Sequence, residues 1–154
     1  MSDSLFSLAF DALEPGTEFR TRGRTITESD IVAFAGLTGD FHPQHVDREW
    51  AARGLFGERV AHGLLVLSFA AGLVPFDPER VVALRRLERV TFTAPTRIGD
   101  TISVQGRLVS TRAVDERVGL VGCDWGVVNQ REEVLVRARV QVLWRRDPAS
   151  PAAE

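Results

Sequence analysis

The second half of the chain alternates apolar and polar residues with a period of two. Three segments show this alternation, over residues 89–94, 102–108 and 134–142, and a more apolar run covers residues 118–128. Such alternation indicates β-strands with one covered face. Because short connections join successive strands, the pattern favours an antiparallel sheet.

Residues 63–74 show a different pattern, because they would be apolar on every side of a helix. Ser68 is the only polar residue in this run. A helix that is hydrophobic all round must be enclosed by the rest of the protein. We therefore predict an α+β fold in which an antiparallel sheet wraps around one long buried helix.

An amphipathic helix is predicted nearer the start of the chain. It begins after Thr27, since the sequence Thr-Glu-Ser-Asp is typical of a capped helix N-terminus, and it ends at Gly39. Its apolar stripe consists of Ile31, Phe34, Ala35 and Leu37. A polar loop stiffened by Pro43 follows, and then a short helix over residues 48–53 with Trp50 on its inner face.

Length and composition narrow the possible functions. The 154 residues suit a single domain, and we expect its ends, residues 1–16 and 147–154, to be flexible. A formal charge of -2 gives no general attraction to nucleic acid. All 19 basic residues are arginines, which excludes a Schiff-base lysine and a phosphate-loop lysine. No secretory signal or bilayer-length apolar run is recognisable, so we expect a cytoplasmic protein that does not enter membranes.

Two side chains able to transfer protons lie five residues apart in the polar loop: Asp40 and His45. Such a loop can turn both toward one point. Less than twenty residues later, Gly63 begins the apolar helix, where backbone N–H groups lack internal partners and carry the positive end of the helix dipole. A base, an acid and an oxyanion donor are the groups that proton transfer beside a carbonyl needs.

The remaining polar candidates have competing structural interpretations. His42, His45 and His62 follow no familiar zinc spacing, so we expect neither a metal nor a bound cofactor. Ser68 would donate to a backbone carbonyl one turn back, with substrate contact as the alternative. Cys123, the lone cysteine, lies in a strand-like run and is expected to be a buried small hydrophobe.

The residues around Asp40 resemble the hydratase motif of the MaoC-like dehydratases, which include the (R)-specific enoyl-CoA hydratases. The motif spans residues 38–47, with the sequence Thr-Gly-Asp-Phe-His-Pro-Gln-His-Val-Asp, and continues in Phe56-Gly57 and in His62-Gly63-Leu64-Leu65. The similarity covers the chain from about Pro15 to Trp144. This sequence departs from the family pattern at His42, a position where the family usually has asparagine.

This resemblance implies a hot dog fold, a homodimer with sheets joined edge to edge, and acyl-CoA or acyl-carrier thioesters as substrates. It also implies catalysis by Asp40 and His45, which would hold one water between them, and a thioester oxygen resting on the backbone N–H of Gly63. Coenzyme A would enter only as part of the substrate. His42 and Pro43, in the same motif, are candidates for substrate binding.

Three arginines beside a predicted strand are further candidates: Arg85, Arg86 and Arg89. Guanidinium groups suit phosphate geometry, so these side chains could contact the phosphates of coenzyme A, although a solvated charged face is the simpler interpretation.

Two alternatives to an enoyl-CoA hydratase stay open. One is a biosynthetic dehydratase or cyclase acting on a carrier-bound or natural-product thioester, and the other is a non-catalytic subunit of a heteromeric hydratase.

Overall fold

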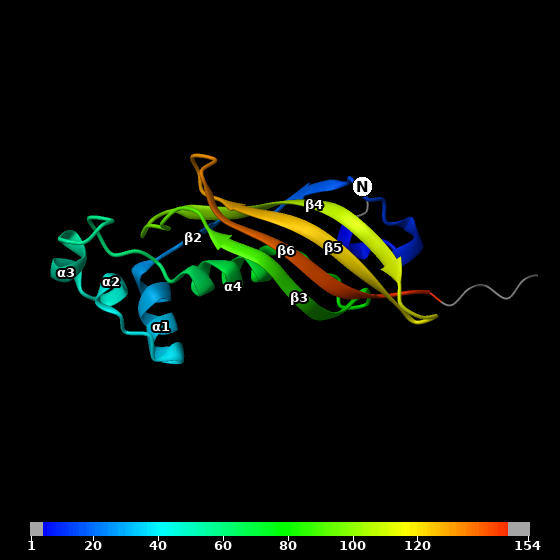
Figure 1. Cartoon of the computed structure of the whole chain (residues 1–154), viewed down its shortest axis with the longest axis horizontal. Coiled ribbons are helices and arrows are strands. Elements are labelled where there is room, and N and C mark those ends of the chain that lie inside the picture. Colours follow the sequence, from blue (N-terminus) through cyan, green and yellow to red (C-terminus); the bar gives the residue numbers. More distant parts are fainter. Residues whose placement is uncertain (1–4, 148–154) are drawn as a thin grey trace, which may run out of the picture.

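A computed structural model describes residues 5–147 and shows one curved antiparallel sheet (Figure 1). Its strands follow the order β1-β4-β5-β6-β3, and β2 also pairs with β4. The strands are β1 (Glu18–Arg20), β2 (Arg24–Thr25), β3 (Val81–Phe92), β4 (Thr101–Ala113), β5 (Val118–Val128) and β6 (Val134–Arg145). The four long strands fall on the three alternating segments and on the apolar run at residues 118–128, so the predicted antiparallel sheet is confirmed.

The apolar run forms helix α4 (Gly63–Leu73), which lies against one face of the sheet (Figure 1). Leu65, Val66 and Ala70 of this helix join the core with apolar side chains from β4, β5 and β6. The prediction of a helix enclosed on every side is wrong in one respect. Leu64, which is 61% exposed, and Ser68, one turn on, lie on a solvent-facing stripe, because the sheet covers only one side of α4.

Helices α1 (Glu28–Thr38), α2 (Pro43–Val46) and α3 (Arg48–Ala52) gather at one end of the sheet (Figure 1). Thr27 caps α1 through a reciprocal capping box with Asp30, and Gly39 ends it with a left-handed φ of 78°, both as predicted. Residues 43–46 were predicted as loop but form the single turn of α2. Trp50 was predicted to face inward but is 42% exposed.

The N-terminal segment differs from the flexible end that the sequence predicts. Residues 5–13 form two short 3-10 turns, Leu5–Ser7 and Phe10–Ala12, and bury Phe6, Phe10 and Leu13 in the core. The indole of Trp144 donates a hydrogen bond to the backbone oxygen of Leu8 at 3.1 Å. Apolar side chains that looked unpatterned therefore anchor this segment. Residues 1–4 and 148–154, also predicted to be flexible, lie outside the described residues.

Strand β3 forms an edge of the sheet and is the least regular of the long strands. Its pairing with β6 shifts register three times, and Arg89 adopts a left-handed φ of 52° within the last shift. Apolar residues on β3 remain substantially exposed: Val82, Leu84, Leu87 and Phe92.

Cys123 on β5 is buried as predicted, and burial raises the pKa of its thiol to about 12. In the part of the chain described, no helix is long and apolar enough to cross a membrane.

Candidate active site

Asp40 is positioned by the end of helix α1. Gly39 turns the chain out of the helix while its N–H donates to the oxygen of Ala35 at 2.8 Å. The N–H of Asp40 then donates to Oγ1 of Thr38, and the Asp40 carboxylate accepts from the N–H of His42 at 3.3 Å. These local bonds hold a carboxylate that remains 53% exposed, so that it can reach a solvent molecule.

His45 lies on α2, and its ring is buried. Its Nδ1 is 2.7 Å from the backbone oxygen of Val60. Because a carbonyl oxygen can only accept, Nδ1 must carry the proton, and Nε2 of the neutral ring keeps a free lone pair. Val60 is held in turn by a bridge to Arg97 and by its own N–H, which donates to the oxygen of Gln44.

The pKa of His45 is lowered from its ordinary value, chiefly because burial disfavours the charged ring. The hydrogen bond to Val60 opposes this shift, whereas the neighbouring ring of His62 adds to it and the charge of Asp40 opposes it. A neutral imidazole with an unprotonated Nε2 is the form that a general base requires.

His62, which was not among the predicted catalytic residues, forms a cluster with Asp40 and His45. Its ring stacks on that of His45, with centroids 3.8 Å apart, and its Nε2 is 3.0 Å from the backbone oxygen of Asp40. Polar atoms of Asp40, His45 and His62 all lie within 4.8 Å of one another. One water that hydrogen-bonds to two groups spans ~4.5 Å between them, so the spacing of Asp40 and His45 suits a water shared by these two side chains.

The same three side chains are poorly arranged for a metal ion. An imidazole binds a metal through a lone pair in the plane of its ring, at about 2.0–2.1 Å for zinc. The rings of His45 and His62 are stacked with only 26° between their planes. Their lone pairs therefore do not converge on a common point at bonding distance. The arrangement favours proton transfer over metal binding.

Gly63 is the first residue of α4 and borders a pocket of about 410 Å³ next to His45. A Cβ atom on Gly63 would stand 2.7 Å from the ring of Phe92, so a larger residue here would force that ring to move. The lining is mainly apolar. It comes from the loop before α4, from α4, from the end of β3 and the loop after it, and from β6: Phe56, Val60, Ala61, Leu64, Phe92, Ala94, Pro95, Leu135 and Val136. The pocket thus joins an apolar cavity to a helix N-terminus and a histidine.

His42 and Pro43, predicted to bind substrate, do not line this pocket. His42 is the N-cap of α2, where its Nδ1 accepts from the N–H of Gln44 at 3.1 Å, and Pro43 is the first residue of the helix. An asparagine would cap the helix in the same way through its side-chain oxygen. The histidine that departs from the family pattern therefore supplies an equivalent hydrogen bond.

The other predicted substrate-binding residues also lie away from the pocket. Ser68 is on the exposed stripe of α4 and donates to the oxygen of Leu64 at 2.7 Å, which is the backbone bond that the sequence predicts. Arg85 and Arg86 are exposed on β3, where Arg86 pairs with Glu88 at 3.0 Å. Contact of any of these side chains with coenzyme A stays a prediction.

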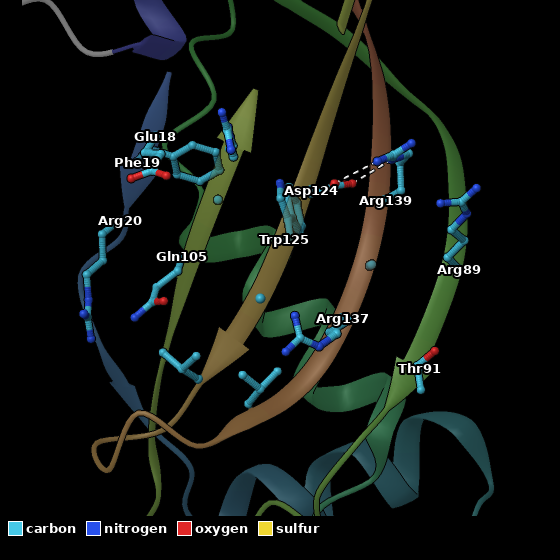
Figure 2. Close-up of a pocket in the computed structure, with 16 residues that line it drawn as sticks. Glu18, Phe19, Arg20, Arg89, Thr91, Gln105, Asp124, Trp125, Arg137 and Arg139 are labelled. Carbon is cyan, nitrogen blue, oxygen red and sulfur yellow. Dashed lines mark hydrogen bonds and ion pairs between the residues drawn. The ribbon is translucent and has the colours of Figure 1, made fainter. Parts of the chain in front are cut away.

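Arg89 lines a second hollow, of about 960 Å³, on the outer face of the sheet (Figure 2). Figure 2 shows side chains of β1, β4, β5, β6 and β3 pointing to this side, with the coils of α4 behind the sheet. Asp124 and Arg139, neighbours across β5 and β6, form a bidentate ion pair at 2.6 and 2.8 Å. The groove is thus separated by the sheet from the pocket beside α4.

Comparison with known proteins places this geometry in a family. Residues 11–124 match the family model described as MaoC like domain. The chain is 31% identical over 142 residues to an (R)-specific enoyl-CoA hydratase of Rhodospirillum rubrum, covering 90% of this chain and 98% of the relative. It is 44% identical over 101 residues to Protein MaoC of Klebsiella aerogenes, but spans only 30% of that protein's length.

A solved structure supports the fold independently. The chain superimposes with a TM-score of 0.84 on a Mycobacterium tuberculosis protein described as having a double hot dog fold. The match covers 98% of this chain and 48% of that one, at 20% identity, so it bears on the fold alone. The sheet order and the packed helix α4 agree with this fold. The chain therefore belongs to the MaoC-like dehydratase family and adopts a hot dog fold.

Proposed function

We propose that the protein adds water to a trans-2-enoyl thioester of coenzyme A, giving an (R)-3-hydroxyacyl thioester, or catalyses the reverse dehydration. Family membership supports a hydro-lyase activity in general. The observation that carries the specific reaction is the convergence of Asp40 and His45, within 4.8 Å, beside an apolar pocket that begins at Gly63.

The chemistry starts from a water held between the Asp40 carboxylate and Nε2 of His45. His45 removes a proton as the water oxygen forms a bond to C3 of the enoyl chain, and the C2–C3 double bond shifts its electrons toward the thioester carbonyl. The proton then passes from the pair to C2, which restores both groups and the thioester. Delivery of oxygen and proton from one side implies syn addition.

The negative charge that develops on the thioester oxygen during the reaction must be stabilised by a hydrogen-bond donor. The N–H of Gly63 lies in the first turn of α4, where backbone N–H groups have no partner within the helix. Its contribution should resemble that of other oxyanion donors, whose removal raises barriers by about 2.7–4 kcal/mol. The apolar lining supports an acyl chain as the group that enters the pocket.

We also propose a homodimer, as the family resemblance implies. Strand β3 is a sheet edge, and exposed edges attract a partner strand. Two apolar residues of β3 are partly exposed: Leu84 at 57%, and Phe92, which borders the pocket, at 48%. A second copy paired along β3 would cover these residues. Light scattering coupled to size-exclusion chromatography should therefore give about twice the 17.0 kDa chain mass.

Hydration assays on the purified chain test the proposal. We expect loss of the enoyl absorbance with crotonyl-CoA and longer trans-2-enoyl-CoAs, and chiral analysis should find the (R)-3-hydroxyacyl product. Turnover of carrier-bound thioesters alone would favour the biosynthetic dehydratase. Absence of turnover with both substrate classes would contradict the proposed activity and favour the non-catalytic subunit.

A further inference from the structure

His62 is the most completely buried polar group in the site, with 3% of its side chain exposed. Three segments surround it. Its ring stacks on His45 of α2 and packs against Phe34 of α1, with centroids 5.0 Å apart, and its backbone begins α4. As the N-cap of α4, it makes no capping bond with its side chain. Its ring therefore does not cap α4 and can instead hydrogen-bond to the neighbouring loop that carries Asp40.

The hydrogen bonds of His62 define its tautomer. Nε2 faces the backbone oxygen of Asp40 at 3.0 Å and a carboxylate oxygen of the same residue at 3.9 Å. Both of these oxygens accept, so Nε2 carries the proton. Nδ1 is buried without a hydrogen-bond partner among the described residues. A bare acceptor is tolerated in that position more readily than a buried N–H without a partner.

We propose that His62 is a positioning residue for the hydration reaction: it holds the Asp40 turn through Nε2–H and fixes the plane of the His45 ring by stacking. Both catalytic side chains are thereby directed at the same water. This inference rests on the proposed function, and it adds a residue that touches neither water nor acyl chain. His62 does not line the acyl pocket, so its effect falls on kcat rather than on substrate binding.

Two substitutions separate the two contacts. His62→Phe keeps an aromatic ring against His45 but removes the donor to Asp40, whereas His62→Gln keeps an N–H near the position of Nε2 but removes the stack. We expect kcat to fall ~10- to 100-fold in each, since small misplacements of reacting groups have effects of this size. KM should stay within about twofold of wild type, by the same reasoning that only positioning is lost.

Trp144→Phe is the matched control, because Trp144 is equally buried but bonds to Leu8 in the N-terminal segment. It should lower thermal stability and leave kcat per folded molecule unchanged. Wild-type kcat in both folded His62 variants would overturn the proposal. The proposal would also be overturned if the His62 variants lost activity only in proportion to their unfolded fraction, which is the result expected for Trp144→Phe.

A measurement without substrate keeps this proposal separate from the proposed function. ¹⁵N NMR of the histidine rings in the wild-type protein should show His62 protonated at Nε2 and bare at Nδ1. A proton on Nδ1 of His62 instead of Nε2 would contradict the positioning role. Failure of the wild type to hydrate enoyl thioesters would instead contradict the proposed function.

Discussion

The two hollows of this protein lie on opposite sides of one sheet and differ in how their polar groups are held. The outer groove is more than twice as large, at about 960 Å³ against about 410 Å³. There, Asp124 and Arg139 form an ion pair across two neighbouring strands. In the smaller pocket, His45 is directed by the backbone oxygen of Val60, and its other nitrogen is left free.

This difference shows why size is a poor guide to chemistry in this fold. An exposed ion pair is satisfied by its own partner and by water, and contributes little. A buried imidazole with one nitrogen bonded to the backbone is fixed in tautomer and in direction, which makes its second nitrogen a base. Function is therefore expected where buried polar groups converge on an apolar cavity.

The largest contrast between the two regions should appear when a carboxylate is removed from each. Asp40→Asn should lower kcat by about 10²–10⁴-fold, the range typical of a proton-transfer group. Asp124→Asn removes a carboxylate of the same size from the outer groove and should leave kcat within about twofold. Steady-state kinetics on crotonyl-CoA would measure both, and equal effects would remove the distinction between the regions.

A methyl group added at the helix N-terminus should sharpen the comparison. Gly63→Ala would place Cβ 2.7 Å from the Phe92 ring, so we expect the free energy of unfolding to fall by about 1–3 kcal/mol. The activity should fall with it as the pocket deforms, and Phe92→Leu in the same chain should restore part of both. Urea titration and kcat/KM measure these changes.

Gly36→Ala is the control for this substitution. Gly36 lies within α1, and a Cβ there meets nothing within 4 Å. It should raise the free energy of unfolding by about 0.5–1 kcal/mol, because alanine loses less entropy in a helix. If Gly63→Ala were equally stabilising, the contact with Phe92 would not exist in solution.

A pH titration tests the environment of His45. Its pKa lies below 6.5, so the acid limb of kcat/KM should fall below pH 6.5, with activity lost as the base is protonated. Between the lowered pKa and 6.5 the unfolded chain binds more protons than the folded one, so stability should rise with pH across that window. An acid limb above pH 6.5 would contradict the effect of burial.

The smallest effect should follow substitution of the residue that departs from the family. His42→Asn should keep kcat within about threefold of wild type, because the amide oxygen replaces Nδ1 as the cap of α2. His42→Ala should lower the free energy of unfolding by ~1 kcal/mol. A large loss of activity in His42→Asn would indicate that the imidazole contacts substrate, as the sequence alone predicts.

The sequence predicted what depends on local pattern. Alternation located three of the long strands and an apolar run located the fourth, β5, while Thr27 and Gly39 located helix α1. It did not predict that one stripe of α4 stays exposed, because periodicity shows that a face is apolar but not what covers it. It also missed the core position of Phe6, which depends on segments distant in sequence.

The site was predicted in part for the same reason. Asp40, His45 and Gly63 belong to one recognisable motif. The structure places Asp40 within 4.8 Å of His45 and sets His45 and Gly63 on one pocket. The position of His62 could not be read from spacing, because three separate helices create its surroundings. The three arginines of β3 had only a chemical suitability for phosphate, and the structure places Arg89 in the outer groove.

A crystal structure of Asp40→Asn with bound crotonyl-CoA would test the proposed geometry most directly. We expect the thioester oxygen about 2.7–3.1 Å from the N–H of Gly63. The C3 atom should face a water that is bound to Nε2 of His45. An acyl group lying in the outer groove, or one in the pocket with its thioester turned away from Gly63, would contradict the proposed site.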